Sequence, residues 1–151
     1  MLNDILYLIL ITFIPTLELR LSIPYGIISG MSASVVIPVV IASNIVLGLI
    51  VYFLLIRFTD YFLRFKWFCR IYYPVIDRAH RKTKKYADKY GFWGIALFIA
   101  VPIPGSGSYT GALAAYILGM EYKSFALANL IGVIIAGTLV SLATIGIISF
   151  F

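Results

Sequence analysis

Two long apolar stretches without any ionisable residue constrain this chain more than any other feature of its sequence. They cover residues 34–56 and 125–151. A helix of about 20 apolar residues crosses the hydrocarbon core of a bilayer, so both stretches are long enough to span it. The composition agrees, because 62% of the 151 residues are hydrophobic and 12% are charged, whereas soluble domains are about a quarter charged. We therefore expect an all-α integral membrane protein and exclude a disordered chain, a disulfide-rich domain and an ordinary soluble enzyme.

The positive charge is concentrated between the two spans. Ten of the twelve Lys and Arg residues lie between Arg57 and Lys89, interleaved with aromatic residues over the first part of this segment. Basic connectors are retained on the cytoplasmic side of a membrane, and cations mixed with aromatic rings suit the lipid headgroup region. No nucleic-acid-binding motif accompanies the cluster, so we expect membrane lipids and no nucleic acid as its partners.

The apolar segments that precede the two spans are short and interrupted. In the first half, two apolar runs flank Glu18-Leu19-Arg20, and in the second half two others flank the proline- and glycine-rich turn 102–111. Prolines remove backbone hydrogen bonds from a helix and glycines loosen it. Each segment is therefore predicted to be a re-entrant hairpin of two half-length helices, although one kinked helix remains an alternative in the first half. The four apolar runs are residues 5–17, 21–33, 92–101 and 112–120.

These segments predict one membrane domain over residues 1–151, built from two repeats of inverted topology. A re-entrant hairpin enters and leaves on one face, so each half crosses the membrane once, in opposite directions. Inverted repeats are a recurring plan of secondary transporters, with the substrate at the midplane. Two spans would enclose the hairpins poorly, so we expect a homodimer. The predicted parts are hairpin 1–33, transmembrane helix 34–56, basic cytoplasmic and interfacial helices 57–90, hairpin 91–120 and transmembrane helix 125–151.

Glu18 and Arg20 are the ionisable residues inside the apolar region of the first half. A charge at the centre of a membrane helix costs about 2.5–3.5 kcal/mol on insertion scales, so such residues are candidates for function. Glu18 is a candidate proton acceptor or ion ligand, and Arg20 a candidate anion ligand. A pair that neutralises itself is the alternative. Burial and the neighbouring guanidinium act in opposite directions on the pKa of Glu18, so its protonation stays open.

The turn of the second half is the other candidate site. Successive N–H groups in a glycine-rich turn can form a concave anion-binding nest, and a half-helix that begins near Gly111 would add its positive N-terminal end. A turn that only reverses the chain is the alternative. The candidate residues are Pro24 and Gly26 after the first charged pair, and Pro102, Pro104, Gly105, Ser106, Gly107, Ser108, Tyr109, Thr110 and Gly111 in the turn.

Other kinds of chemistry find no support in the sequence. No Gly-Lys-Ser/Thr follows the turn, so it is not a phosphate-binding P-loop. Cys69 is the single cysteine, and His80 lies among lysines and arginines without a second histidine nearby. We therefore expect no catalytic residues, no metal and no cofactor.

At two places the sequence resembles a known family. Residues 15–26, Pro-Thr-Leu-Glu-Leu-Arg-Leu-Ser-Ile-Pro-Tyr-Gly, and the turn 102–111, Pro-Ile-Pro-Gly-Ser-Gly-Ser-Tyr-Thr-Gly, are similar to the small multidrug export protein family of archaea and bacteria. Ser106 stands where that family has threonine. The arrangement also resembles the DedA-like, or VTT-domain, superfamily, which has facing re-entrant hairpins and lipid-transporting members, but no arginine precedes Pro102 as it does in DedA proteins. The resemblance implies a multi-pass transporter of a prokaryotic cell membrane.

Three functions follow from these features. The first is transport of an amphipathic anionic lipid, a polyprenyl phosphate or a phospholipid, with proton coupling through Glu18. The second is proton-coupled export of lipophilic cationic drugs, although Arg20 would repel a cation that came near it. The third is a membrane assembly factor that transports nothing, in which the charged pair is structural.

Overall fold

The computed structural model describes residues 2–14, 17–62, 91–102 and 106–150, and the regular secondary structure within them is α-helical. The predicted all-α fold is thus confirmed for the described part of the chain. Of the predicted basic segment 57–90, residues 57–62 end a long helix, and the rest lies outside the described residues. The helices are α1 (Leu2–Thr12), α2 (Glu18–Ile28), α3 (Ala33–Phe62), the helix Gly91–Ala100, α5 (Ser108–Ile117) and α6 (Tyr122–Phe150).

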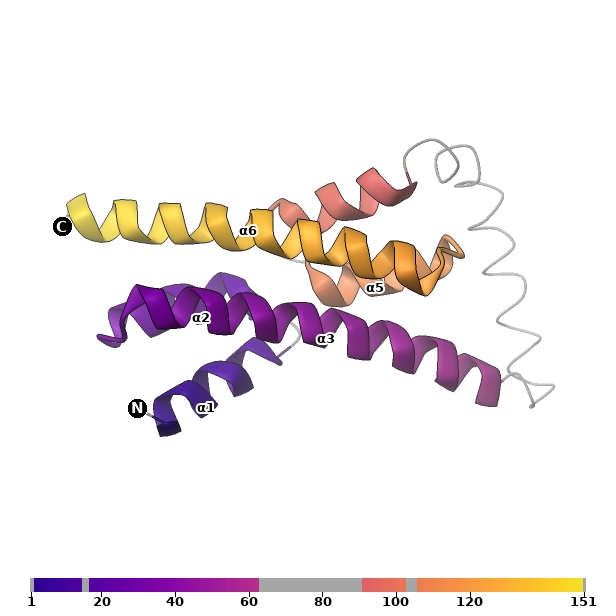
Figure 1. Ribbon diagram of the computed structural model, residues 1–151, viewed down its shortest axis with the longest axis horizontal. Helices are drawn as coiled ribbons and strands as arrows, with labels where there is room; N and C mark the ends of the chain where they lie inside the picture. Colours follow the sequence, from indigo (N-terminus) through magenta and orange to yellow (C-terminus); the bar gives the residue numbers. More distant parts are fainter. Residues whose placement is uncertain (1, 15–16, 63–90, 103–105, 151) are drawn as a thin grey trace.

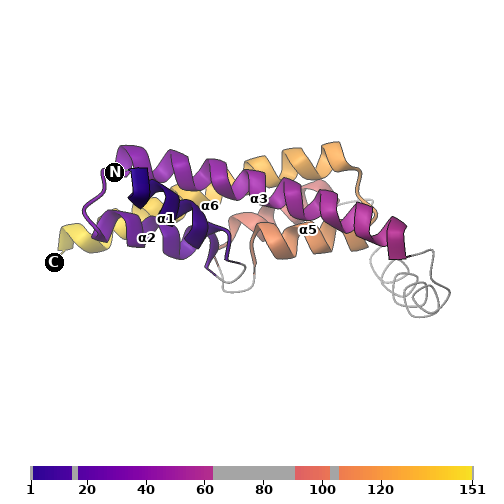
Figure 2. The ribbon, with the colours of Figure 1, turned by 90° about the horizontal axis from the view of Figure 1, so that it is seen from below.

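Two long helices, α3 and α6, run side by side in opposite directions and form the frame of the molecule (Figure 1). The pair α1 and α2 packs at one end of this frame, and the helix Gly91–Ala100 packs with α5 at the other end (Figures 1 and 2). In each pair the chain runs from an end of the molecule toward its middle and then back. The tips of the two pairs meet there through hydrogen bonds between residues of the first half and residues of the second, namely Phe13, Glu18 and Arg20 with Val101, Ser106, Ser108 and Tyr109.

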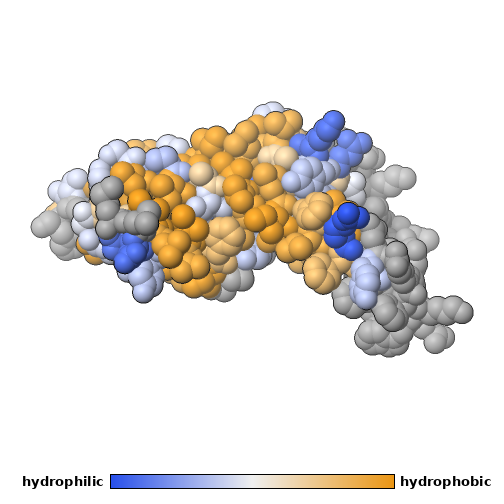
Figure 3. Space-filling model, turned by 60° about the horizontal axis from the view of Figure 1, so that its bottom comes forward, coloured by the Kyte–Doolittle hydropathy of each residue, from blue (hydrophilic) through white to orange (hydrophobic). Residues whose placement is uncertain are grey.

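The surface of the long helices indicates a lipid environment. Two segments, Ala33–Thr59 and Tyr122–Ile147, are long and apolar enough to cross a membrane, and 28% and 39% of their most apolar windows are buried. A core helix of a soluble protein would bury most of such a window. Here apolar side chains cover the outside, and Figure 3 shows a broad hydrophobic surface between hydrophilic residues near the ends. An exposed apolar surface of this extent is typical of a membrane protein.

The observed helix bounds differ in detail from the predicted ones. The long helices begin at Ala33 and Tyr122, close to the predicted starts at residues 34 and 125. The first break was expected at Glu18-Leu19-Arg20; it falls before Glu18 instead, and α2 begins there and continues through Pro24. A proline removes one intrahelical hydrogen bond, but a helix held between neighbouring helices can continue past it. The alternative of one kinked helix in the first half is wrong, because α1 and α2 are separate helices that run in opposite directions and pack against each other (Figure 1).

Glycines allow the helices to approach one another closely. A Cβ atom on Gly132 of α6 would lie 2.7 Å from the carbonyl oxygen of Ala96. Cβ atoms on Gly48 and Gly137 would each lie 2.6 Å from a side chain of the opposite long helix. Small residues are the usual means by which membrane helices pack at short distance. These three glycines therefore permit close helix packing, whereas Gly146 would meet nothing within 4 Å.

The turns before α3 and α6 are built in the same way. Gly30 (φ 85°) and Gly119 (φ 68°) each adopt the left-handed conformation that ends a helix. The next residue in each turn, Met31 or Met120, donates its N–H to the carbonyl five residues earlier, at 3.1 and 3.0 Å. These bonds satisfy carbonyl groups at the ends of α2 and α5. Both turns therefore reverse the chain without leaving those groups unpaired.

The close contact at Gly132 makes a stability prediction. Gly132→Ala places a methyl group against the backbone of the helix Gly91–Ala100, which cannot move away as a side chain can, and should lower the free energy of unfolding by about 1–3 kcal/mol. Gly146→Ala in the same helix is the matched control, with open space around it. Thermal unfolding of both variants in detergent tests the packing. Equal melting temperatures would contradict it.

Candidate functional site

The Glu18 carboxylate lies at the centre of the molecule, on the N-terminus of α5. Its two oxygens accept hydrogen bonds from the backbone N–H groups of Ser108 and Tyr109, each at 3.2 Å. The first N–H groups of a helix have no partner within the helix, and the residue before α5, Gly107, has no side chain to cap them. A carboxylate in this position also interacts favourably with the positive end of the helix dipole. Glu18, 4% exposed, therefore caps a helix of the other half of the chain.

Gly107 provides the space for this carboxylate. A Cβ atom there would lie 2.1 Å from Glu18 Oε2 and 2.7 Å from its Cδ, distances that no real side chain maintains. The backbone of Gly107 is extended, so its conformation does not require glycine. The requirement is steric: any larger residue would displace the carboxylate from the N–H groups.

Arg20 forms the complementary contact with the helix before the turn. Its Nη2 donates to the carbonyl oxygen of Val101 at 3.1 Å and to Ser106 Oγ at 2.8 Å. Ser106 Oγ in turn donates to the Val101 carbonyl at 2.6 Å. Val101 directly follows the helix Gly91–Ala100, whose C-terminal end carries partial negative charge. Glu18 and Arg20 thus bind opposite helix ends on the two sides of one turn.

The backbone of Glu18 is itself in an unusual conformation. Its φ is 43°, in the left-handed region that a residue with a side chain occupies at a cost of about 1–3 kcal/mol. Ser22 Oγ donates to the Glu18 carbonyl at 2.7 Å, and Thr12 Oγ1 lies 2.9 Å from Ser22 Oγ. Thr12 and Ser22 are fully buried. Together with the carboxylate contacts, these bonds hold the strained residue in place.

Two buried asparagines extend the polar centre, and neither was predicted from the sequence. Asn44 Oδ1 accepts a 2.5 Å hydrogen bond from Ser108 Oγ, and Asn129 Nδ2 donates to the carbonyl of Ile45 at 3.1 Å. Both residues are 0% exposed, and among the described residues Asn44 Nδ2 and Asn129 Oδ1 have no hydrogen-bond partner. Each is the single Asn or Gln within its predicted span, and this was the signal that could have revealed them.

The structure brings together only part of the predicted site. Ser106, Gly107, Ser108 and Tyr109 surround the two charges, and the Tyr109 hydroxyl also donates to the Phe13 carbonyl at 2.9 Å. α5 begins at Ser108 rather than near Gly111, so its N-terminus reaches the turn itself.

The remaining predicted residues have other surroundings. Gly111 packs against Ile99, and Gly26 lies close to Val36 and Leu8, so both glycines serve helix packing. Pro102 and Thr110 are exposed, Pro24 is partly buried inside α2, and Pro104 and Gly105 lie outside the described residues.

The fold and this centre define a class: an all-helical membrane protein in which charged side chains at the tip of one helix pair form hydrogen bonds with the tip of the other. The chain matches the family described as "Putative small multi-drug export protein" over residues 18–139, and it belongs to that family. The match begins at Glu18 and includes the turn 102–111. Comparisons with curated proteins and with solved structures returned no match. The resemblance to the DedA-like superfamily stays a prediction.

The capping contact predicts coupling between Glu18 and Gly107. Glu18→Ala leaves the first N–H groups of α5 unpaired and should destabilise the protein by about 1–3 kcal/mol. Gly107→Ala should also destabilise the wild type, because its methyl group displaces the carboxylate, but it should have little effect in the Glu18→Ala background. Unfolding free energies of the two single variants and the double variant measure this coupling. Additive effects would contradict it, and Gly91→Ala, whose Cβ would have 3.9 Å of space, is the matched control.

Proposed function

We propose that this protein is a secondary transporter that moves an amphipathic anionic lipid, a polyprenyl phosphate or a phospholipid, with proton coupling through Glu18. One observation carries the proposal: the N–H groups of Ser108 and Tyr109, which begin α5, donate hydrogen bonds to the two oxygens of the Glu18 carboxyl group. Helix N-termini bind phosphate groups with the same groups and the same dipole. Membership of an export family supports transport as the activity.

In the proposed cycle, the Glu18 side chain competes with the substrate for the N–H groups that begin α5. When Glu18 is ionised, its carboxylate fills the nest and the tips of the two helix pairs are joined. Protonation removes the charge that makes these hydrogen bonds strong, so the carboxylate can leave and a lipid phosphate can take its place. Arg20, two residues along α2, then lies near the same turn and offers a second positive group. Return of the ionised carboxylate displaces the phosphate.

Helix length supports re-entrant hairpins in this cycle. α1 and α2 have 11 residues each and α5 has 10, so each is about 15–17 Å long at about 1.5 Å per residue. This is about half of the roughly 30 Å hydrocarbon core. A helix pair that enters from one face would therefore turn near the midplane, where the nest is proposed to meet its substrate.

Matching positions in the two halves support an inverted repeat. Gly30 and Gly119 are separated along the chain by the same number of residues as Met31 and Met120. The first residues of α3 and α6 have this same separation. Because α3 and α6 run in opposite directions, the two halves would have opposite orientation in the membrane. With the basic segment 57–90 in the cytoplasm, the turn before α3 faces outward and the turn before α6 faces inward. A homodimer remains part of this proposal, since a second copy would cover the outer faces of the hairpins.

This topology can be tested by cysteine labelling in a prokaryotic cell membrane. In a Cys69→Ser background, Ser29→Cys lies in the exposed turn after α2, and Lys123→Cys lies at the exposed start of α6. A membrane-impermeant maleimide applied to intact cells should label the first variant at once and the second only after permeabilisation. Labelling of both from the same side would contradict the inverted topology.

The second candidate is export of lipophilic cations, which the family description favours. In that case a cation would exchange with a proton on Glu18. The contacts of Glu18 favour the first candidate, because positive N–H groups surround the carboxylate and would repel a cation. An assembly factor without transport activity is the third possibility.

Liposomes separate the three candidates. Wild-type protein should move labelled polyprenyl phosphate or phospholipid faster than empty liposomes do, with a rate that depends on pH. Glu18→Gln should lower the rate about tenfold or more and remove its pH dependence, because glutamine cannot exchange a proton; this corresponds to the loss of one charge-assisted interaction. Gly107→Ala should also lower the rate, whereas Gly91→Ala should not.

The same liposomes, loaded with a cationic dye, test the second candidate, export of cations. Lipid movement no faster than in empty liposomes, together with Glu18-dependent dye efflux, would overturn lipid transport in favour of cation export. Failure of the wild type in both assays would overturn both and favour the assembly factor.

A further inference from the structure

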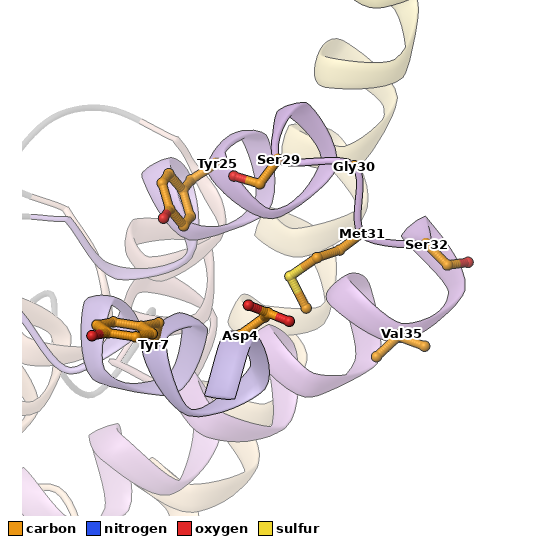
Figure 4. Close-up of a pocket in the computed structure, with 8 residues that line it drawn as sticks. All are labelled: Asp4, Tyr7, Tyr25, Ser29, Gly30, Met31, Ser32 and Val35. Atoms are coloured by element: carbon orange, nitrogen blue, oxygen red, sulfur yellow. The ribbon is translucent and has the colours of Figure 1, made fainter. Parts of the chain in front are cut away.

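A cavity of about 390 Å³ lies at one end of the molecule, between the start of α1 and the turn before α3 (Figure 4). Its walls include Tyr7, Tyr25 and Met31, and Asp4 is the charged residue among those that line it. The Asp4 carboxylate interacts with the N-terminal amino group of the chain, so it already has a partner. Because a carboxylate also repels a phosphate, this cavity is a poor place for a phosphate headgroup.

At the centre of the molecule, one buried donor faces the Glu18 carboxylate without completing a hydrogen bond. Asn44 of α3 is fully buried, and its Oδ1 accepts a 2.5 Å hydrogen bond from Ser108 Oγ. This bond fixes the amide at the N-terminus of α5, where Asn44 lies beside the Glu18 carboxylate and interacts with it. Among the described residues, however, Asn44 Nδ2 has no hydrogen-bond partner. A buried donor without a partner costs about 1–3 kcal/mol, so a ligand that satisfies this donor would bind more tightly.

The shape of the carboxylate explains why this donor has no partner. The two oxygens of Glu18 lie in one plane, and they accept the N–H groups of Ser108 and Tyr109. A phosphate is tetrahedral, so two of its oxygens can take the places of the carboxylate oxygens while a third points out of their plane. A phosphate monoester has three terminal oxygens that are strong acceptors, whereas a diester has two. Only the monoester therefore has a terminal oxygen left for a third donor.

We propose that Asn44 Nδ2 binds this third oxygen, so that the N-terminus of α5 selects a lipid phosphate monoester over a phosphodiester lipid. The inference rests on the proposed function, because it concerns the anion that replaces the Glu18 carboxylate there. It narrows the substrate to a lipid whose phosphate has a single ester bond, with a polyprenyl or a diacylglycerol tail. The charge agrees, because a phosphate monoester carries about −1.5 to −2 at pH 7 and Arg20 lies beside the same turn.

Asn129 is a second buried asparagine and serves as the control. It is as fully buried as Asn44, but its Nδ2 donates to the carbonyl of Ile45 at 3.1 Å, and the atom without a described partner is Oδ1, an acceptor. Its amide packs against Gly48 of α3. An acceptor offers no hydrogen bond to an anion. Asn129→Ala therefore removes a buried amide of the same size without removing a donor for a phosphate.

Two small phosphate esters test the selection directly. Butyl phosphate and methyl butyl phosphate have the same chain and differ by one methyl group on a phosphate oxygen. In Glu18→Ala, the N-terminus of α5 is free of the carboxylate, and the rise of the melting temperature with ester concentration gives the Kd of each ester. The titrations are run in detergent at about pH 8, where most of the monoester is a dianion.

Butyl phosphate should bind Glu18→Ala about tenfold or more tightly than the diester does. Adding Asn44→Ala should lower this ratio about tenfold, as expected for loss of a hydrogen bond to a charged group, whereas adding Asn129→Ala should leave the ratio unchanged. The ratio separates a donor from a merely structural residue, because a general loosening of the site would weaken both esters alike. Equal binding of the two esters to Glu18→Ala, or a ratio that does not depend on Asn44, would overturn the inference.

A second variant and two longer esters complete the test. If Glu18→Ala does not fold, Glu18→Gln takes its place, since it keeps the size of the side chain and removes the charge. Farnesyl phosphate and dioctanoyl phosphatidate, both monoesters, distinguish the polyprenyl tail from the diacylglycerol tail by their Kd values. Asn44→Ala should weaken whichever binds more tightly by about tenfold, and no weakening of either would overturn the inference.

These outcomes are independent of the liposome assays. If the monoester is selected through Asn44 but no lipid moves, the monoester site stands and the proposed function is wrong. If a phosphodiester lipid moves as fast as polyprenyl phosphate in a Glu18-dependent way, the selection is wrong and the proposed transport stands.

Discussion

The centre of this protein depends on the hydrogen bonds between the Glu18 carboxylate and the first N–H groups of α5. Backbone groups within a bilayer must be satisfied by the protein or by water in a cavity, since lipid tails offer no partners. If the two helix pairs are re-entrant, as proposed, their inner ends lie where this requirement is strictest. Glu18 satisfies the N-terminal end of α5, and Arg20 satisfies the carbonyl that follows the helix Gly91–Ala100. The two charged side chains, Glu18 and Arg20 of the first half, thereby form hydrogen bonds with backbone groups at the helix ends of the second half.

The geometry of α2 explains why these charges bind separate partners instead of each other. Residues two positions apart on a helix point to different sides of it, and Glu18 and Arg20 have that spacing. Each charge therefore meets a helix end of opposite partial charge, on either side of the turn that contains Ser106 and Gly107. This arrangement makes the pair structural, and under the proposed function it also lies where a transported anion would bind. The two roles predicted for Glu18 and Arg20, a structural one and a functional one, are therefore compatible.

The sequence was sufficient to predict the helical fold, the two long spans and the residues at the two tips, because apolar runs, charges and glycine-rich turns are local signals. It could not predict which groups would meet, since the bonds from Glu18 to Ser108 and Tyr109 join residues about 90 positions apart. The first break was predicted at residues 18–20, where the charges lie, but it falls before Glu18, and packing between neighbouring helices maintains α2 from Glu18 through Pro24. Asn44 was missed because a single amide in an apolar run carries no charge, although its cost of burial makes it equally informative.

The left-handed backbone of Glu18 connects the proposed proton coupling to movement of the hairpins. A φ of 43° persists only while surrounding bonds compensate for its cost, and the contacts of the carboxylate with α5 are among these bonds and are charge-assisted when Glu18 is ionised. In the proposed cycle, protonation weakens those contacts, so the strain favours a return of Glu18 to an ordinary helical conformation. That return would rotate the start of α2 and release the hydrogen bonds of Arg20 Nη2 to Val101 and Ser106, so that its guanidinium becomes available to a phosphate beside the turn. One proton would thereby loosen both links between the tips, which is what a transporter requires of a gate at its midplane.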